Sequence, residues 1–515
     1  MNQMQKIDSN MTISPCVTHK DTRTSMHHRN RWNSIAIWII IALANMASLA
    51  YVLLRYRGSG ISGAALALGV FGIGWCTSWL AARLVLQGKS SWASVGLLIG
   101  CASVSALFFE AALEKRIWSN LVVLSSIDTD SPEYYAWSAD GKRDVKPNSL
   151  PLEEFHRKGD EAAHLAAAMA ISATWGNPNG IAKFVGQRQG HNRTYWIARA
   201  LAGHPPGLAG LYAPVCHNPP AARVWAFLFF LASVCLAWWA GNNWSSETKF
   251  GLLCASCFAF LPNLNWWHMT SVSSDIPPAI FTFLGSGILG RYLVQKQDAQ
   301  TQDSAALFSA GILFGLGTFV TYTAGLAAGA AVIAYWLLTP RESRKMSHLV
   351  WLLAPAVCAV FLGTLYSKIA IPNSHTVLGA RVAAIAGDDT QGNAFMHPLK
   401  AAYIFVTRWP MDLGAALTVF FILIPIWLWL CERERFRGKL GKLAMALAVL
   451  LPAATFFWPE IRFTFPSLVL LIVGLGFKDF WESASNHQRS AMIAAIASFG
   501  FSKYVLHSLL VAGAA

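Results

Sequence analysis

Two groups of polar residues within one long polar segment have types and a spacing that suit chemistry. Asp160 and Glu161 come just before an Ala-rich run, and this pattern predicts a helix with a carboxylate pair in its first turn. Such carboxylates can accept a proton or bind a cation, or they can simply complement the helix dipole. Later in the segment, His204-Pro205-Pro206-Gly207 offers an imidazole on a stiff stretch of chain.

Further polar candidates lie near the ends of apolar runs elsewhere in the chain. Asp275, in the sequence Ser-Ser-Asp-Ile-Pro-Pro, either caps a helix or supplies a carboxylate to a site. Glu460 and Arg462 open a late apolar run. The Arg there either snorkels to lipid headgroups or binds an anion through its forked guanidinium group. His268 is a further candidate for a metal, and Arg408 for an anion.

The composition places these groups in a membrane protein. Of the 515 residues, 55% are hydrophobic and only 13% are charged, whereas soluble domains carry about 25% charged residues. Repeated apolar runs of roughly 17–25 residues match the thickness of a bilayer and predict an all-α polytopic membrane protein. The formal charge of +14 would suit a nucleic-acid-binding protein. We attribute it instead to Lys and Arg on cytoplasmic loops, and expect no nucleic acid partner.

The apolar runs predict about thirteen transmembrane helices, with a turn near Thr321-Tyr322-Thr323 that divides one long run into two spans. The predicted spans are 33–54, 61–82, 92–113, 224–241, 249–262, 273–290, 304–320, 323–339, 349–366, 411–431, 440–457, 463–480 and 490–512. Most of the nine cysteines lie inside these spans, and Cys254-x-x-Cys257 is interpreted as two small apolar residues rather than a redox or metal pair. Only Cys216 lies in a long outer loop, so no disulfide framework is expected.

The distribution of Lys and Arg predicts which ends of the spans face outward. With the amino terminus inside, the predicted cytoplasmic segments hold more of these residues than the short and medium external loops, as the positive-inside rule requires. Two long polar loops, 115–221 and 367–410, then emerge on the same outer face. Asp160 and His204 lie in the first of these loops, and Asp275 and Arg462 are predicted at the outer ends of their spans. Few ionisable residues fall within the spans, which argues against an ion-driven carrier.

Together the motifs resemble those of the GT-C superfamily of membrane glycosyltransferases, especially its protein-mannosyltransferase and aminoarabinose-transferase branch. The resemblance is carried by Asp160-Glu161, His204-Pro205-Pro206, Ser274-Asp275-x-Pro277, the glycine-rich span with Gly311, Gly315 and Gly317, and Arg462-Phe-x-x-Pro466. The chain departs from the family pattern at His164, at Thr321-Tyr322-Thr323 and at Phe463.

The resemblance also implies a division of the chain into domains. A GT-C-like transmembrane core would cover 92–480, including both outer loops. A basic cytoplasmic tail (1–32) and two additional spans (33–91) would precede the core, and a C-terminal span (481–515) would follow it.

The activity that the resemblance implies uses a sugar attached to a polyprenyl phosphate, whose lipid chain would lie among membrane lipids and spans. The acceptor would be a lipid, a glycan or a protein on the periplasmic side of a bacterial inner membrane, and the anomeric centre would be inverted. Displacing the phosphate requires a base for the acceptor hydroxyl, and cations or hydrogen-bond donors for the leaving group. We expect Asp160 to be the base, assisted by Glu161. The residues expected to bind substrate are His204, Asp275, Arg462, Glu460, His268 and Arg408.

Cofactor use and two other classes of function stay open at this point. A divalent metal at Asp160, Glu161 and His204 is an alternative to a metal-free site, and no other cofactor is implied. A transporter or flippase of lipid-linked glycan intermediates would need charged groups near the middle of the membrane and two alternating openings. A non-catalytic scaffold would use its outer loops to bind partners. An enzyme needs its charged groups at one surface beneath a loop, where the candidate residues are predicted.

Overall fold

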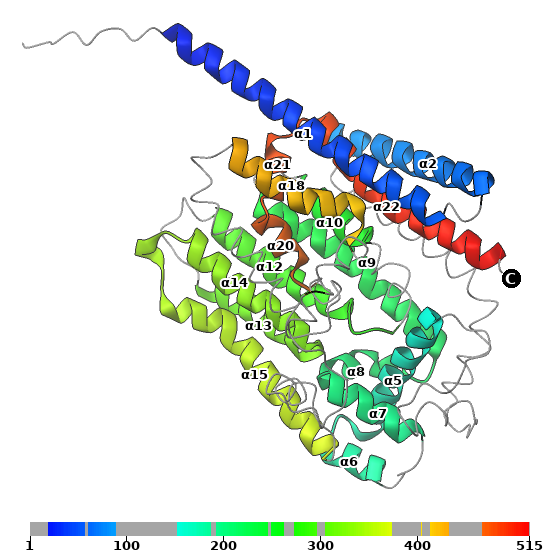
Figure 1. Ribbon diagram of the computed structural model, residues 1–515. Coiled ribbons are helices and arrows are strands. Elements are labelled where there is room, and N and C mark those ends of the chain that lie inside the picture. The colour runs from blue at the N-terminus through cyan, green and yellow to red at the C-terminus, as the bar shows by residue number, and fades with distance from the viewer. Residues whose placement is uncertain are drawn as a thin grey trace, which may run out of the picture.

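The protein is described by a computed structural model in which the described residues are 19–56, 60–88, 152–186, 192–245, 249–261, 272–295, 304–372, 403, 413–431 and 466–513. Within these residues every regular element is a helix, and none is a strand. Figure 1 shows the helices stacked in a slanted bundle. The α-helices and 3-10 helices (η) are α1 (His19–Tyr56), α2 (Gly60–Gln87), α5 (Leu152–Thr174), α6 (Pro178–Gly186), α7 (Asn192–Gly203), α8 (Pro206–Tyr212), η2 (Ala213–Val215), α9 (Pro219–Trp244), α10 (Phe250–Ala259), α12 (Pro277–Gln295), α13 (Ser304–Val320), η4 (Tyr322–Ala324), α14 (Gly325–Leu338), η5 (Arg341–Ser343), α15 (Met346–Ala370), α18 (Ala415–Cys431), α20 (Leu468–Gly474), α21 (Phe477–Ser483) and α22 (Asn486–Gly513).

Four of the described helices are long and apolar enough to cross a bilayer. They are Trp32–Leu54, Gly63–Gln87, Ala221–Trp244 and Met346–Ala370, and they coincide with predicted spans. For the described residues, the prediction of an all-α membrane protein is therefore confirmed. Most of the other predicted spans correspond to shorter or less apolar helices, while 92–113 and 440–457 lie outside the described residues. The number of thirteen spans stays a prediction.

Two predicted spans differ in extent from the helices of the structure. The span predicted at 33–54 is the apolar part of a longer helix, since α1 already begins at His19 and its first part extends beyond the bundle (Figure 1). The span predicted at 463–480 is divided into α20 and α21. The division falls at Gly476, which has a φ of 82° and whose position leaves no room for a Cβ beside Leu428. A left-handed residue ends a helix, and glycine adopts that conformation without strain.

Glycines allow α13 and α15 to approach closely and in parallel. A Cβ on Gly311 would overlap the carbonyl oxygen of Trp351, and a Cβ on Gly315 would lie 2.8 Å from the Cβ of Pro355. Because α13 and α15 run in the same direction, the chain must return between them, and α14 is the helix that runs in the opposite direction. The turn predicted near Thr321-Tyr322-Thr323 is therefore confirmed, because η4 occupies this place between α13 and α14.

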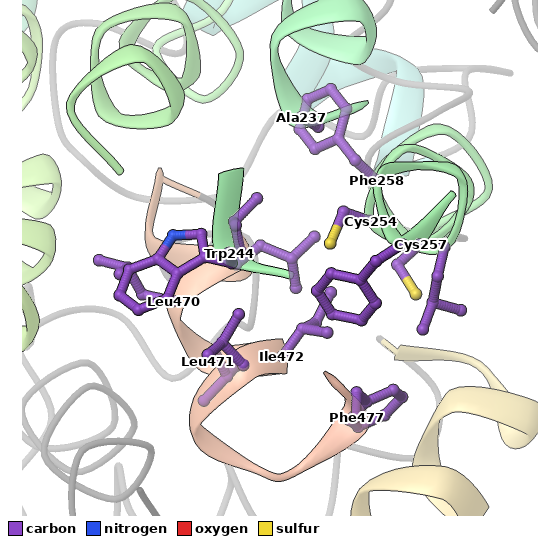
Figure 2. Packing of buried hydrophobic residues seen from close by; sticks show 14 of the residues in the cluster. Ala237, Trp244, Cys254, Cys257, Phe258, Leu470, Leu471, Ile472 and Phe477 are labelled. Carbon is purple, nitrogen blue, oxygen red and sulfur yellow. The ribbon is translucent and has the colours of Figure 1, made fainter. Parts of the chain in front are cut away.

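The central core of the bundle lies where α9, α10 and α20 meet (Figure 2). Trp244, at the end of α9, is fully buried and donates a hydrogen bond from its indole nitrogen to the Ser286 hydroxyl of α12 at 3.0 Å. Cys254 and Cys257 are buried among apolar side chains and carry free thiols. Their interpretation as small apolar residues agrees with this packing.

The first two helices pack against the last one. The rings of Tyr51 in α1 and Phe499 in α22 lie 5.3 Å apart, and at the other end of this contact Gln488 donates a hydrogen bond to the carbonyl of Ser34 at 2.9 Å. These two contacts show that α1 and α22 run in parallel. Figure 1 shows α1, α2 and α22 side by side at one edge of the bundle. Helices α1 and α2 thus form one layer with α22 at the end of the chain.

The close approach of α13 and α15 predicts opposite effects for two glycine substitutions. Gly311→Ala should lower stability by about 1–3 kcal/mol, because the methyl group must push the two helices apart. Gly329→Ala, in α14, meets no atom within 4 Å and should be neutral or stabilise by about 0.5–1 kcal/mol. The measurement is the apparent melting temperature of each purified variant in detergent. Equal melting temperatures for the two variants would contradict the close contact.

Candidate active site at the cap of the bundle

Helices α5, α6, α7 and α8, together with η2, form a separate unit that we call the cap. The cap covers the ends of α13 and α15 and the start of α9 (Figure 1). Its buried core includes Val320 at the end of α13, Ala370 at the end of α15, Ala222 in α9, and Val272 just before α12. The charge pattern predicts that these four places share one face, and the structure brings them together.

Helix α5 is the centre of the cap. Residues 163–170 are all buried, so the helix is enclosed around its whole circumference for two turns. Alanine is abundant here because small side chains let neighbouring helices approach from every side. The predicted start of this helix was wrong: α5 begins at Leu152, so Asp160 and Glu161 do not lie in its first turn. Asp160 and Glu161 are therefore not placed to complement the helix dipole, since that effect is confined to the first turn.

A pair of histidines joins α5 to the end of α7. The rings of His164 and His204 meet edge to face, with centroids 5.0 Å apart. His164 is buried and His204 is partly exposed. Asp160 lies four residues before His164 and thus on the same face of α5. Helix α5, which carries the acid pair, therefore meets the end of α7, which leads into the His204 motif. His164 was treated only as a departure from a family pattern, although its spacing from Asp160 could have identified it.

The His204-Pro205-Pro206-Gly207 motif fits the cap onto the bundle. Pro205 precedes α8 with an extended backbone and packs beside Gly363 of α15. Gly207, in the first turn of α8, approaches α13 so closely that a Cβ would overlap the carbonyl oxygen of Phe319. The prolines fix the direction of the chain and the glycine permits the contact. The motif thus has a structural role, and it sets the place of His204.

Two hydrogen bonds from α15 hold the cap in register with the bundle. The Ser367 hydroxyl donates to the carbonyl of Leu201 in α7 at 2.7 Å. The Tyr366 hydroxyl donates to the carbonyl of Gly176, just after α5, at 3.0 Å. Both acceptors lie at the ends of cap helices, where carbonyl groups lack partners within their own helix.

Asp275 lies at the junction between the cap and the bundle. Its neighbour Val272 belongs to the core of the cap, whereas Ile276 belongs to the core of the bundle. The side chain is only 5% exposed, and the Ser274 hydroxyl lies 3.5 Å from its Oδ1 atom as a hydrogen-bond donor. A buried carboxylate is costly unless it is well paired. Asp275 is therefore a buried junction residue rather than a surface helix cap.

The structure does not test the remaining candidates. Glu460, Arg462, His268 and Arg408 lie outside the described residues. Within the part of the chain that the structure describes, no three His, Cys, Asp or Glu side chains are placed to hold a metal ion. The candidate site therefore consists, so far, of α5 with its acid pair, the two histidines and the segment of Asp275.

The contact of Gly207 with α13 predicts that the cap can be loosened by one methyl group. Gly207→Ala should push α8 away from Phe319, whereas Gly210→Ala in the same helix meets no atom within 4 Å. The readout is Cys216, a buried cap residue whose thiol pKa is raised by burial. Gly207→Ala should increase maleimide modification of Cys216 roughly tenfold, measured by mass spectrometry, because cap opening exposes the thiol. Unchanged modification would mean that the contact does not hold the cap closed.

No family model, curated protein or solved structure matches this chain. The residues of the cap and the short motifs of the sequence are therefore the features from which a function can be inferred.

Proposed function

We propose that this chain is an integral-membrane glycosyltransferase of the GT-C type. It moves a sugar from a polyprenyl-phosphate donor to a lipid, glycan or protein acceptor, with inversion, on the periplasmic side of a bacterial inner membrane. The observation that supports this most is the meeting of α5, which carries Asp160 and Glu161, with His204 at the end of the bundle. The segment of Asp275 belongs to the same end.

The place of the cap suits a donor that is half lipid and half sugar. A polyprenyl chain is soluble only among the transmembrane helices, whereas the sugar and its phosphate stay at the membrane surface. A site at the ends of the helices, beneath a folded cap, can bind both parts at once. In the predicted thirteen-span arrangement, the second outer loop, 367–410, would help to enclose the same site.

The chemistry assigns a role to each group. Asp160 accepts the proton of the acceptor hydroxyl while the acceptor oxygen attacks the anomeric carbon, and the bond from that carbon to the phosphate oxygen breaks. The polyprenyl phosphate leaves with the bonding electrons, and Arg462, Arg408 and neighbouring donors stabilise its charge. His204, partly exposed and placed by its prolines, contacts the substrate.

A carrier is less well supported than an enzyme. Carriers of charged substrates commonly use carboxylates near the middle of the membrane. The apolar helices that the structure describes hold no Asp or Glu in their sequences. Their buried polar groups are instead mainly hydroxyls, such as Ser256 and Thr318. The carboxylates of interest belong to the cap and to its junction with the bundle.

The role of Asp160 predicts a large loss of activity on its substitution. Asp160→Asn should reduce transfer of labelled sugar from a polyprenyl-phosphate donor by roughly 10²- to 10⁴-fold, the usual contribution of a general base. Glu342→Gln, an exposed carboxylate in η5, serves as the matched control and should retain full transfer. Full transfer by Asp160→Asn would remove Asp160 as the base. Translocation without transfer by the unmodified chain would favour a flippase.

The proposed orientation can be checked without knowing the substrate. Asn179 in the cap and Arg341 in η5 are both exposed and lie at opposite ends of the bundle. In intact cells, Asn179→Cys should add one modification by a membrane-impermeant maleimide, relative to the parent chain, and Arg341→Cys should add none. The reverse pattern would place the cap in the cytosol, and the proposed reaction could not use a periplasmic acceptor.

A further inference from the structure

Trp175 adopts a conformation and an exposure that are both unusual for tryptophan. It follows the last residue of α5 with a φ of 53°, and its side chain is 97% exposed. The N–H of Gly176 bonds to the carbonyl of Ile171 at 2.9 Å, and the N–H of Trp175 bonds to that of Ser172 at 3.4 Å. This is the Schellman helix ending, in which the residue at the place of Trp175 is usually glycine. A bulky residue in the left-handed region is an outlier that points to a use of its side chain.

The backbone around Trp175 is held firmly, so the indole ring has a defined direction. The Thr174 hydroxyl bonds back to the carbonyl of Ala170 at 2.8 Å. On the other side, the Asn177 side chain accepts a hydrogen bond from the N–H of Asn179 at 3.0 Å and so caps α6. The exposure of Trp175 is therefore a property of an ordered helix ending rather than of a loose loop.

The position of this helix ending along the bundle is set by α15. The Tyr366 hydroxyl bonds to the carbonyl of Gly176, and α6 packs against the same helix. Tyr366 lies near the end of the apolar helix Met346–Ala370. One turn earlier, Phe361 and Leu362 are exposed, with 66% and 54% of their surface free. Such side chains on a membrane-spanning helix face lipid, so Trp175 lies level with the end of a lipid-facing surface.

Two lysines lie on the two helices that meet here, α6 and α15. Lys183 in α6 and Lys368 in the last turn of α15 are both exposed. Tryptophan prefers the boundary between hydrocarbon and headgroups because its ring is apolar and its N–H is polar. Lysine at this depth extends its ammonium group to lipid phosphates. Their common location favours a lipid surface over a soluble partner.

We propose that Trp175 anchors the cap in the headgroup layer of the leaflet beneath it, with Lys183 and Lys368 contacting lipid phosphates. The anchor fixes the height of the far end of α5 above the hydrocarbon, and hence the depth at which the rest of α5 lies. It requires that the bundle spans a membrane, but not that the chain transfers sugar.

The proposal is tested by measuring the depth of position 175 in the full chain, reconstituted in phospholipid vesicles. A fluorescent amino acid replaces Trp175, and its quenching is compared between lipids that carry a nitroxide on the headgroup and lipids that carry it in mid-chain. The same substitution at Phe361, within the apolar helix, is the depth reference. Position 175 should lose more fluorescence to the headgroup nitroxide than to the mid-chain nitroxide, and Phe361 should show less preference for the headgroup nitroxide.

Lys183, replaced by the same fluorophore, gives an independent measurement if the first variant folds poorly, and it should also be quenched mainly from the headgroup layer. Absence of quenching at both positions would overturn the proposal and place this end of the cap in water. If added glycan changes the fluorescence at position 175 while neither labelled lipid quenches it, this position belongs to a sugar-binding surface, and the anchor is equally overturned.

Discussion

The close contact of backbones along α13 and α15 is the constraint on which the rest of the structure depends. Gly311 and Gly315 let the two helices lie against each other, and Gly363, further along α15, receives Pro205 of the cap. Between lipid-exposed helices the hydrophobic effect contributes little, so packing of small residues has to supply the association. The close contact of α13 with α15 therefore also shapes the surface against which the cap packs.

This arrangement explains why polar groups of interest gather at one end. The cap brings its own buried core, built around the alanines of α5, and joins it to the ends of the long helices. His164 and His204 meet within this unit, and Asp275 lies where its core borders that of the bundle. Polar groups at such a boundary are shielded from bulk water yet remain near the membrane surface. The proposed reaction, between a lipid-linked donor and an acceptor at the membrane surface, would need both conditions.

The long apolar runs were the most predictable feature of the fold, because the length and composition of a span are set by the bilayer itself. The turn at Thr321-Tyr322-Thr323 was predicted from run length alone. Positions governed by local packing were not predictable. The chain from Leu152 continues as helix through Gly159, at a cost of about 0.5–1 kcal/mol relative to Ala that tertiary contacts must offset. The break at Gly476 and the left-handed Trp175 likewise depend on neighbours that no periodicity reveals.

The packing of α1 and α2 against α22 has a consequence for biosynthesis. The ribosome makes the first hairpin long before its partner, and at roughly 5–20 residues per second the delay is on the order of tens of seconds. During that time the faces of α1 and α2 that α22 will cover must be shielded by lipid or by insertion factors. Assembly of this layer therefore cannot be completed until α22 has been made, and a chain truncated before α22 would leave α1 and α2 without the helix that covers them.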